Sequence, residues 1–210
     1  MISVVITTFT DYGDYTTPLI RSILKHEKTP LEIIVVDNGS RSPYPVGMGY
    51  KLIRFNQPVC WAKMLNTGAE ASTGDWLMLL NDDVLCQGSF ANTVERLDAH
   101  GLYGPAMRKK NPSWFDVGVR INYLYAWNLV MKKSVFDRIG GFDEWYQKAG
   151  VDDIDFCWRA EQLSIPLIAV DFPFIHLEPH RREQWDGYRE QMLKSIEYFI
   201  GKVKGNKNDI

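Results

Sequence analysis

The fold is decided by an apolar run at the start of the chain, Ile2-Ser3-Val4-Val5-Ile6-Thr7-Thr8. Three further runs rich in apolar and β-branched residues follow it, at residues 31–36, 52–55 and 76–80. Near-continuous apolar runs are typical of strands that helices cover on both faces. The first half of the chain is therefore predicted to form a buried, mostly parallel sheet.

The segments between these runs have the pattern of helices. Residues 17–24 combine Thr17, Pro18 and apolar residues at helical spacing, and we expect Thr17 to cap this helix. A second helix is expected at residues 62–71, and turn-forming residues fill the gap at residues 38–45. Strands that alternate with helices predict an α/β fold with a mostly parallel central sheet.

The second half of the chain is less regular. Its apolar spacing predicts helices at residues 89–100, 133–139 and 152–163, a strand at 166–170, and strand or loop at 103–107 and 117–130. The sequence has no internal repeat, low-complexity tract or linker-like change in composition. We therefore expect one domain over residues 1–210.

Composition excludes several classes of protein. A chain of 210 residues with 45% hydrophobic content can bury one substantial core. A formal net charge of -2 gives no general attraction to nucleic acid, so nucleic acid is not an expected partner. The three cysteines are odd in number and far apart, which argues against a disulfide framework or a structural zinc site. Without a basic leader or an apolar stretch of membrane-spanning length, a cytosolic chain is expected.

Polar residues follow each apolar run of the first half. They are Thr7-Thr8, Asp37-Asn38, Asn56 and Asn81-Asp82-Asp83. Ligands of open α/β sheets bind beyond the carboxyl ends of the strands, so four polar strand ends indicate one composite site. The alternative is that Asp and Asn simply favour turns.

The adjacent carboxylates Asp82 and Asp83 come where a buried strand leaves the sheet. Clustered carboxylates repel one another, and a bound divalent cation usually offsets that cost. A metal that bridges a diphosphate fits this position, and a solvated Asp turn is the alternative.

Six sequence blocks now point to one family. In chain order they are Val4-Val5-Ile6-Thr7-Thr8-Phe9, Glu32-Ile33-Ile34-Val35-Val36-Asp37-Asn38-Gly39-Ser40, Asn66-Thr67-Gly68 with Gly74, Leu80-Asn81-Asp82-Asp83-Val84, Gly140-Gly141-Phe142-Asp143-Glu144 and Asp152-Asp153-Ile154-Asp155-Phe156-Cys157-Trp158-Arg159. In order and spacing the chain resembles family 2 glycosyltransferases with the GT-A fold. The resemblance implies a nucleotide-sugar donor, a divalent metal, an acceptor hydroxyl on a glycan, lipid or protein, and inversion at the anomeric carbon.

On this resemblance, residues 1–100 form the nucleotide-sugar and metal half. Thr8 and Phe9 would hold the nucleoside, and Asp37 would accept from the imide N–H of uracil or thymine, unless it only caps the Asn38-Gly39 turn. Asn81-Asp82-Asp83 matches the family's Asp-x-Asp motif with Asn in the first place, so Asp82 is expected on the ribose or the metal. The other expected donor-side residues are Asn56, Lys63 and Asn66. The chain has Pro58 where relatives often have Gly, and Leu65 where they commonly have Arg, so Lys63 is expected to supply that positive charge.

Asp83 is the expected direct metal ligand. His176 lies where relatives often carry a metal-binding His, with His180 as a weaker competitor and a structural His as the alternative. Because imidazole is a softer ligand than oxygen, the pair favours Mn²⁺ over Mg²⁺.

Residues 101–180 would form the acceptor and catalytic-base half. Asp153 occupies the family's catalytic-base position and Asp152 replaces the more usual Glu, while Asp155 and Arg159 are four apart and can pair on one helix face. The alternative for these carboxylates is stabilisation of a helix start. The expected acceptor-side residues are Asp143, Glu144, Trp145, Trp127 and Asp152, with Tyr146 and Asn128 as further candidates.

Residues 181–210 would add an amphipathic C-terminal helix. Its apolar stripe is expected to pack onto its own domain or a partner, and peripheral contact with a membrane through residues 181–204 is the alternative. The sequence leaves open whether the chain is one domain of a larger enzyme. The rival functions are a nucleotidyltransferase, which would be expected to have a Gly-rich phosphate loop after the first strand, and an inactive sugar-binding module.

Overall fold

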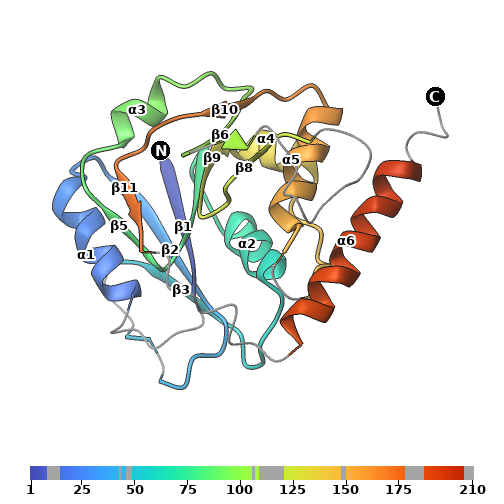
Figure 1. The fold of residues 1–210 in the computed structure, drawn as a ribbon. Helices are drawn as coiled ribbons and strands as arrows, with labels where there is room; N and C mark the ends of the chain where they lie inside the picture. Colours follow the sequence, from blue (N-terminus) through green and yellow to red (C-terminus); the bar gives the residue numbers. More distant parts are fainter. Residues whose placement is uncertain are drawn as a thin grey trace.

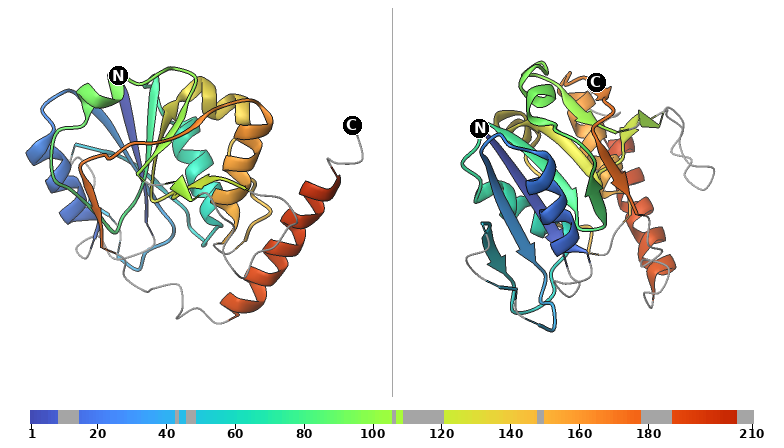
Figure 2. Two further views of the ribbon diagram at one scale, coloured as in Figure 1. Left: turned by 45° about the horizontal axis from the view of Figure 1, so that its top comes forward. Right: turned by 90° about the vertical axis from the view of Figure 1, so that its left-hand side faces the viewer.

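The computed structural model describes residues 1–8, 15–42, 44–45, 49–105, 107–108, 121–147, 150–177 and 187–205. A seven-stranded sheet, with strand order β10-β6-β9-β4-β1-β2-β3, forms the centre of the molecule. Helices cover both of its faces, as Figures 1 and 2 show. The predicted α/β fold with a mostly parallel sheet is confirmed.

Four strands from the first half form one side of the sheet. They are β1 (Ile2–Thr8), β2 (Leu31–Asp37), β3 (Lys51–Arg54) and β4 (Trp76–Asn81), and every pairing among them is parallel. Each begins and ends within one residue of the predicted run. Their carboxyl ends therefore lie at one edge of the sheet, toward the bottom of Figure 1.

The other side of the sheet contains one reversed strand. β9 (Asn128–Lys132) is antiparallel to β4 and to β6 (Leu102–Gly104), and β10 (Leu167–Ala169) pairs in parallel with β6. Because β9 is reversed, its first residues lie beside the last residues of β4. The backbone N–H of Asn81 donates to the carbonyl of Trp127 at 3.1 Å, which places Trp127 at the same edge as the polar strand ends.

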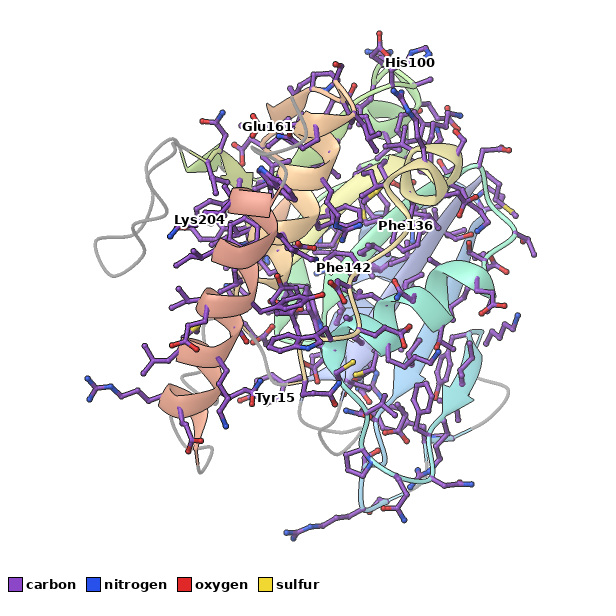
Figure 3. The ribbon with its side chains drawn as sticks, turned by 90° about the vertical axis from the view of Figure 1, so that its right-hand side faces the viewer. Tyr15, His100, Phe136, Phe142, Glu161 and Lys204 are labelled. Atoms are coloured by element: carbon purple, nitrogen blue, oxygen red, sulfur yellow. The ribbon has the colours of Figure 1, made fainter. Side chains whose placement is uncertain are left out.

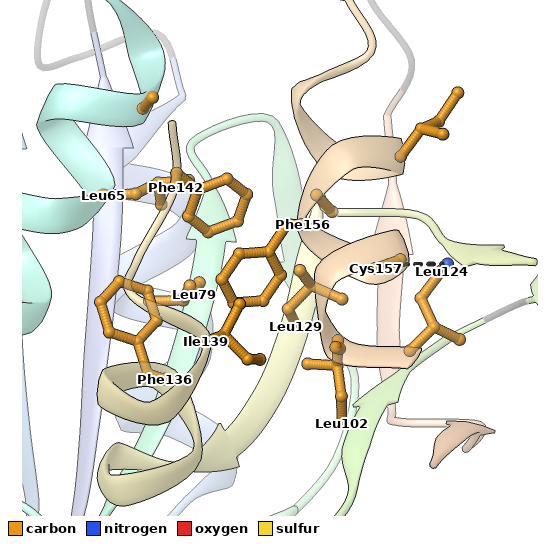
Figure 4. Packing of buried hydrophobic residues seen from close by; sticks show 14 of the residues in the cluster. Leu65, Leu79, Leu102, Leu124, Leu129, Phe136, Ile139, Phe142, Phe156 and Cys157 are labelled. Atoms are coloured by element: carbon orange, nitrogen blue, oxygen red, sulfur yellow. Dashed lines mark hydrogen bonds between the residues drawn. The ribbon is translucent and has the colours of Figure 1, made fainter. Parts of the chain in front are cut away.

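Two apolar cores lie on the two faces of the sheet. One contains buried residues of α1 (Thr16–His26) and of two short strands that pair antiparallel, β5 (Val84–Cys86) and β11 (Phe174–His176). The other contains residues of α2 (Trp61–Glu70), α4 (Lys133–Ile139), α5 (Asp152–Gln162) and α6 (Tyr188–Gly205). In this second core the rings of Phe142 and Phe156 stack with their centroids 4.2 Å apart (Figure 4).

Gly68 allows α2 to lie close to the sheet. A Cβ at this position would be 2.2 Å from Val5 Cγ1 and 3.1 Å from Val36 Cγ2. Any larger residue would push the helix away from β1 and β2. The close approach fixes α2 above the strands that carry Thr8 and Asp37.

Two local predictions are wrong. The first helix begins at Thr16 with Tyr15 as its N-cap and no side-chain cap, so Thr17 is not the cap. The helix expected at 89–100 is only α3 (Ala91–Glu95). It ends early because the N–H groups of Arg96 and Leu97 bond three residues back, and Asp98 then forms a turn of its own by accepting from the N–H of His100 at 2.7 Å.

The expected strand and loop at 103–107 and 117–130 include one further pair. β7 (Met107–Arg108) pairs antiparallel with β8 (Tyr123–Leu124), and residues 109–120 lie outside the described part of the chain. Cys60, Cys86 and Cys157 are all buried and none is in a disulfide.

The C-terminal helix α6 packs onto its own domain. Three residues of its apolar stripe, Ile196, Phe199 and Val203, are buried in the same core as α2 and α5. Each buried side chain of this size contributes about 1.5–3 kcal/mol. Packing onto the domain, the first of the two expectations for this stripe, is confirmed for these residues, and Trp185 lies outside the described residues. Within the described chain, no helix has the length and apolar character needed to cross a bilayer.

Candidate active site

The register of the parallel strands brings the polar strand ends together. Thr8 lies opposite Asp37 on β2, Asp37 lies opposite Arg54 on β3, and Thr7 lies opposite Asn81 on β4. Three of the four polar strand ends, those of β1, β2 and β4, therefore lie together at one edge of the sheet as expected. Asn56 lies on the exposed surface just beyond β3, and Phe9 lies outside the described residues.

Asp82 is bound into the sheet by a hydroxyl network. Thr8 Oγ1 donates to Asp82 Oδ2 at 2.6 Å, and the Tyr44 hydroxyl lies 2.9 Å from Thr8 Oγ1 and 3.0 Å from Thr16 Oγ1. Burial raises the pKa of Tyr44, so its hydroxyl stays protonated. The sequence predicts only a turn around Tyr44, since nothing local shows that a residue between two prolines is buried.

Asp37 is fully buried and both of its oxygens have partners in the chain. Oδ1 accepts from the N–H of Ser40 at 2.9 Å and from the Ser40 hydroxyl, and Oδ2 accepts from Arg54 Nη1 at 2.9 Å. The Ser40 bonds are the turn-capping contact that was the alternative for Asp37. The ion pair with Arg54 was not foreseen, because it depends on the pairing of β2 with β3.

The two expected metal ligands lie side by side. β5 and β11 place His176 opposite Val84, and His176 Nε2 lies 3.4 Å from Asp83 Oδ1. The His176 ring stacks on Trp127, with centroids 5.1 Å apart and an angle of 4° between the planes. A carboxylate oxygen and an imidazole nitrogen form a donor set that suits Mn²⁺. No group of three or more His, Cys, Asp or Glu gathers into a metal cluster among the described residues, which exclude His180.

Asn66 and Lys63, expected on the donor side, contact the loop after α4. Asn66 Nδ2 donates to the carbonyl of Phe142 at 2.9 Å and to Glu144 Oε1 at 3.0 Å, and Asn66 Oδ1 accepts from the N–H of Phe142 at 2.8 Å. Lys63 Nζ lies 3.4 Å from Glu144 Oε1. Gly141 has a φ of +70°, and a Cβ there would be 2.8 Å from Asn66 Oδ1, so glycine is required where the loop meets Asn66.

The start of α5 carries the expected base. Its N-cap, Val151, has a φ of +77°, a conformation that costs a β-branched residue about 1–3 kcal/mol and that occurs most often near functional sites. Asp152 is buried and accepts from the N–H of Gly150 at 3.1 Å, whereas Asp153 is half-buried. Asp153 is thus the more accessible of the two carboxylates.

The expected pair between Asp155 and Arg159 is confirmed. Arg159 Nε donates to Asp155 Oδ2 at 2.8 Å, and Arg159 Nη1 donates to the carbonyls of Ile139 and Gly141, each at 2.8 Å. This pair joins α5 to the loop that follows α4. Within this pair Asp155 is fully buried, whereas Arg159 is half-buried.

The remaining acceptor-side candidates differ in exposure. Trp145 is 42% exposed, Trp127 is half-buried against His176, and Asn128 is fully buried. Within the described chain the Asn128 amide has no hydrogen-bond partner. Asp143 accepts from the N–H of Trp145 at 2.9 Å through Oδ1, and its Oδ2 accepts from Tyr198 and Lys202 of α6.

A mostly parallel sheet with one reversed strand and a carboxylate-rich edge defines the class: an α/β protein with its candidate site at the carboxyl ends of the strands. Residues 3–158 match the model of glycosyl transferase family 2. The chain therefore belongs to glycosyl transferase family 2. No curated protein sequence matches it.

Solved structures of similar fold are GT-A glycosyltransferases. The mannosyltransferase PcManGT from Pyrobaculum calidifontis, in complex with GDP-Man and Mn²⁺, superposes with a TM-score of 0.64 at 17% identity, over 93% of this chain and 62% of that one. GalNAc-T7 with UDP, GalNAc and Mn²⁺ gives 0.72 at 13% identity, over 94% of this chain and 48% of that one. S. aureus TarS gives 0.60 at 16% identity, over 82% of this chain and 36% of that one. The chain thus spans less than two thirds of each of these proteins.

Proposed function

We propose that this chain transfers a sugar from a nucleoside-diphosphate sugar to an acceptor hydroxyl, with inversion at the anomeric carbon. The observation that carries the proposal is the approach of His176 to Asp83, 3.4 Å apart, at the end of β4 in a family 2 chain. Two segments more than ninety residues apart place these side chains together, at the edge where ligands of α/β sheets bind.

Asp83 and His176 would hold a divalent cation, with Mn²⁺ preferred over Mg²⁺. Their oxygen and nitrogen atoms fit such an ion, and two of the similar structures are complexes that contain Mn²⁺. When bound, a divalent cation supplies charge neutralisation for the departing nucleoside diphosphate. Asp82 is 3% exposed and accepts a hydrogen bond from Thr8. It would contact the ribose or the metal at this edge of the sheet.

For the donor we propose a uridine or thymidine diphosphate sugar. The support is the position of Asp37 at the end of β2, where a carboxylate can accept from a pyrimidine imide N–H. Because Asp37 is fully buried and already bonds to Ser40 and Arg54, a base reaches its carboxylate only if side chains that cover it move aside. Guanine also carries an N–H donor, so GDP-sugars are the alternative donors.

For the base we propose Asp153. A sugar hydroxyl is a weak nucleophile at neutral pH, and a carboxylate within hydrogen-bond reach can accept its proton as the oxygen attacks the anomeric carbon. Asp155 is paired with Arg159 and Lys202, and Asp152 is buried, which leaves Asp153 as the more accessible carboxylate at the start of α5.

The test is turnover of nucleotide sugars by the purified chain. UDP-glucose, UDP-GlcNAc, dTDP-glucose and GDP-mannose are incubated with Mn²⁺, Mg²⁺ or a chelator, and release of the nucleoside diphosphate is measured. The proposal expects release from at least one donor with Mn²⁺ and none in chelator. Conversion of a nucleotide sugar and added pyrophosphate to nucleoside triphosphate and sugar 1-phosphate would indicate a nucleotidyltransferase. Binding without turnover of any donor would indicate an inactive sugar-binding module.

A further inference from the structure

The C-terminal helix α6 lies beyond the residues that match the family, yet it contacts the loop on the acceptor side. The family match ends at residue 158, and α6 spans Tyr188–Gly205. Figure 3 shows α6 running past the segment that carries Phe142. Three of its side chains, Met192, Tyr198 and Lys202, meet residues of the acceptor side.

Lys202 links two carboxylates from different segments. Its Nζ donates to Asp155 Oδ1 at 2.7 Å and to Asp143 Oδ2, and only 23% of the Lys202 side chain is exposed. Burial alone lowers the pKa of Lys202, but the two carboxylates outweigh burial and raise it. The charged form is therefore favoured, so Lys202 holds the loop residue Asp143 to the base-bearing helix α5.

Tyr198 holds the same loop through two different contacts. Its hydroxyl donates to Asp143 Oδ2 at 3.0 Å, and its ring stacks on Trp145 with centroids 3.8 Å apart and 11° between the planes. One face of the Trp145 indole is covered in this way, while the residue remains 42% exposed. The Tyr146 ring lies perpendicular to the same indole, with centroids 5.8 Å apart, so the exposed area is the part of the indole that Tyr198 and Tyr146 leave uncovered, here called its outer face.

Met192 covers the turn just before the base. Gly150 has a φ of +123°, and a Cβ there would be 2.4 Å from the Cε and Sδ atoms of Met192. The helix thus contacts both the loop of Trp145 and the turn that leads into Val151 and Asp153.

We infer that α6 is a positioning element for the acceptor: through Tyr198 and Lys202 it holds residues 141–147 so that the outer face of Trp145 meets a carbohydrate acceptor. The apolar C–H face of a pyranose packs on an aromatic ring, and a ring that is already held in place loses little entropy on binding. The inference rests on the proposed glycosyl transfer. Donor binding at the strand ends does not involve Tyr198 or Lys202.

The first measurement is hydrogen exchange of the backbone amides. In Lys202→Met the amides of residues 141–147 should exchange about tenfold faster or more, because the loop loses its ion pair to α6, while amides of β1 and β4 keep their rates. Tyr198→Phe retains the stack on Trp145 and should show a smaller increase than Tyr198→Leu. Lys194→Met is the matched control, since Lys194 is exposed and bonds to Glu190 of the same helix. Unchanged exchange in Lys202→Met and in Tyr198→Leu would overturn the inference.

The second measurement compares transfer with hydrolysis of one donor. The acceptors are the p-nitrophenyl glycosides of glucose, galactose, xylose and N-acetylglucosamine. In Lys202→Met the KM for the acceptor should rise about tenfold, with donor hydrolysis and donor KM within about twofold of wild type. A wild-type ratio of transfer to hydrolysis in a variant whose loop exchanges faster would also overturn the inference. Failure of the proposed function is distinct, because the wild-type chain would then release no nucleoside diphosphate at all.

Discussion

Thr8 Oγ1 donates a hydrogen bond to Asp82 Oδ2 at 2.6 Å, across the end of two neighbouring strands. The next residue, Asp83, instead approaches His176 of β11. Two adjacent carboxylates thus belong to different surroundings, one part of a buried hydroxyl network and the other beside an imidazole. Variants of the two residues should therefore behave differently.

Asp83→Ala is expected to abolish metal-dependent turnover and leave the fold intact, because it removes the carboxylate beside His176. Asp82→Asn keeps an oxygen for Thr8, and its half-saturating Mn²⁺ concentration should stay within about threefold of wild type even if donor affinity falls. Donor hydrolysis is measured over a range of Mn²⁺ concentrations, with circular dichroism as a control for folding. Full activity of Asp83→Ala in excess chelator would contradict the assignment.

Asp153→Asn is expected to lower kcat by about a hundredfold or more and to leave donor affinity nearly unchanged, because Asn preserves size but cannot accept the proton. The matched variant is Asp152→Asn, in which the buried neighbour is changed. Single-turnover transfer and donor binding by calorimetry separate the two effects. Loss of activity in Asp152→Asn with a near-normal rate in Asp153→Asn would show that the base has been assigned to the wrong carboxylate.

Glu27→Gln is expected to destabilise the fold at neutral pH. Glu27 Oε2 accepts from Ser89 Oγ and from the N–H groups of Phe90 and Ala91, each at 2.9 Å, where α3 begins. Burial alone would raise the pKa of Glu27, but these hydrogen bonds, together with one from the N–H of Thr29, outweigh it and lower the pKa from 4.5 to about 2. The ionised form is worth about 2–3 kcal/mol of unfolding free energy.

This contribution has a defined pH window. A carboxyl whose pKa is lower in the folded state stabilises the fold above its unfolded pKa of 4.5, and the gain is lost as pH falls toward 2. The difference in urea-unfolding free energy between wild type and Glu27→Gln should therefore be constant above about pH 5 and shrink below it. Glu95→Gln, at an exposed position of the same helix α3, is the control and should show no such pH dependence.

Gly68→Ala is expected to destabilise the chain although alanine is the better helix former. The added Cβ would meet Val5 Cγ1 at 2.2 Å, and such overpacking costs about 1–3 kcal/mol, more than the roughly 1 kcal/mol gained in helix propensity. In Gly201→Ala of α6 the new Cβ has no atom within 4 Å, so only the gain in helix propensity remains and the free energy of unfolding should rise. Chemical denaturation measures the change in unfolding free energy of each variant. Stabilisation of Gly68→Ala would show that α2 can move away from the sheet at little cost.

The elements that were predicted well are those with long, regular patterns. β1 and α4 have the predicted bounds, because continuous apolar runs and helical spacing decide them locally. The pair β5 and β11 was not predicted, because strands of three residues have no detectable period. The two strands are also far apart in the sequence, with Cys86 opposite Phe174 in the antiparallel register. The carboxylates alone predict a metal at this strand end, and the family resemblance adds His176 as a ligand. The unpredicted pair of strands is what brings Asp83 and His176 together.

Partners of the site residues were the least predictable part. Arg54 and Tyr44 contact Asp37 and Thr8 through strand register and chain folding, which no local pattern encodes. Likewise Asp143 was expected to face the acceptor, while its oxygens bond to Trp145, Tyr198 and Lys202. A single sequence indicates which residues can carry chemistry more readily than which residues hold them in place.

The position of α6 late in the sequence determines which contacts can form first during synthesis. Synthesis proceeds from the N-terminus, and β1 to β4 with the bond from Thr8 to Asp82 require only the first 82 residues. Asp143, in contrast, has no Lys202 to bond until 59 more residues have been added. On the ribosome the bond from Thr8 to Asp82 can therefore form before Asp143 has its partner, and the loop of Trp145 is held only after α6 has emerged.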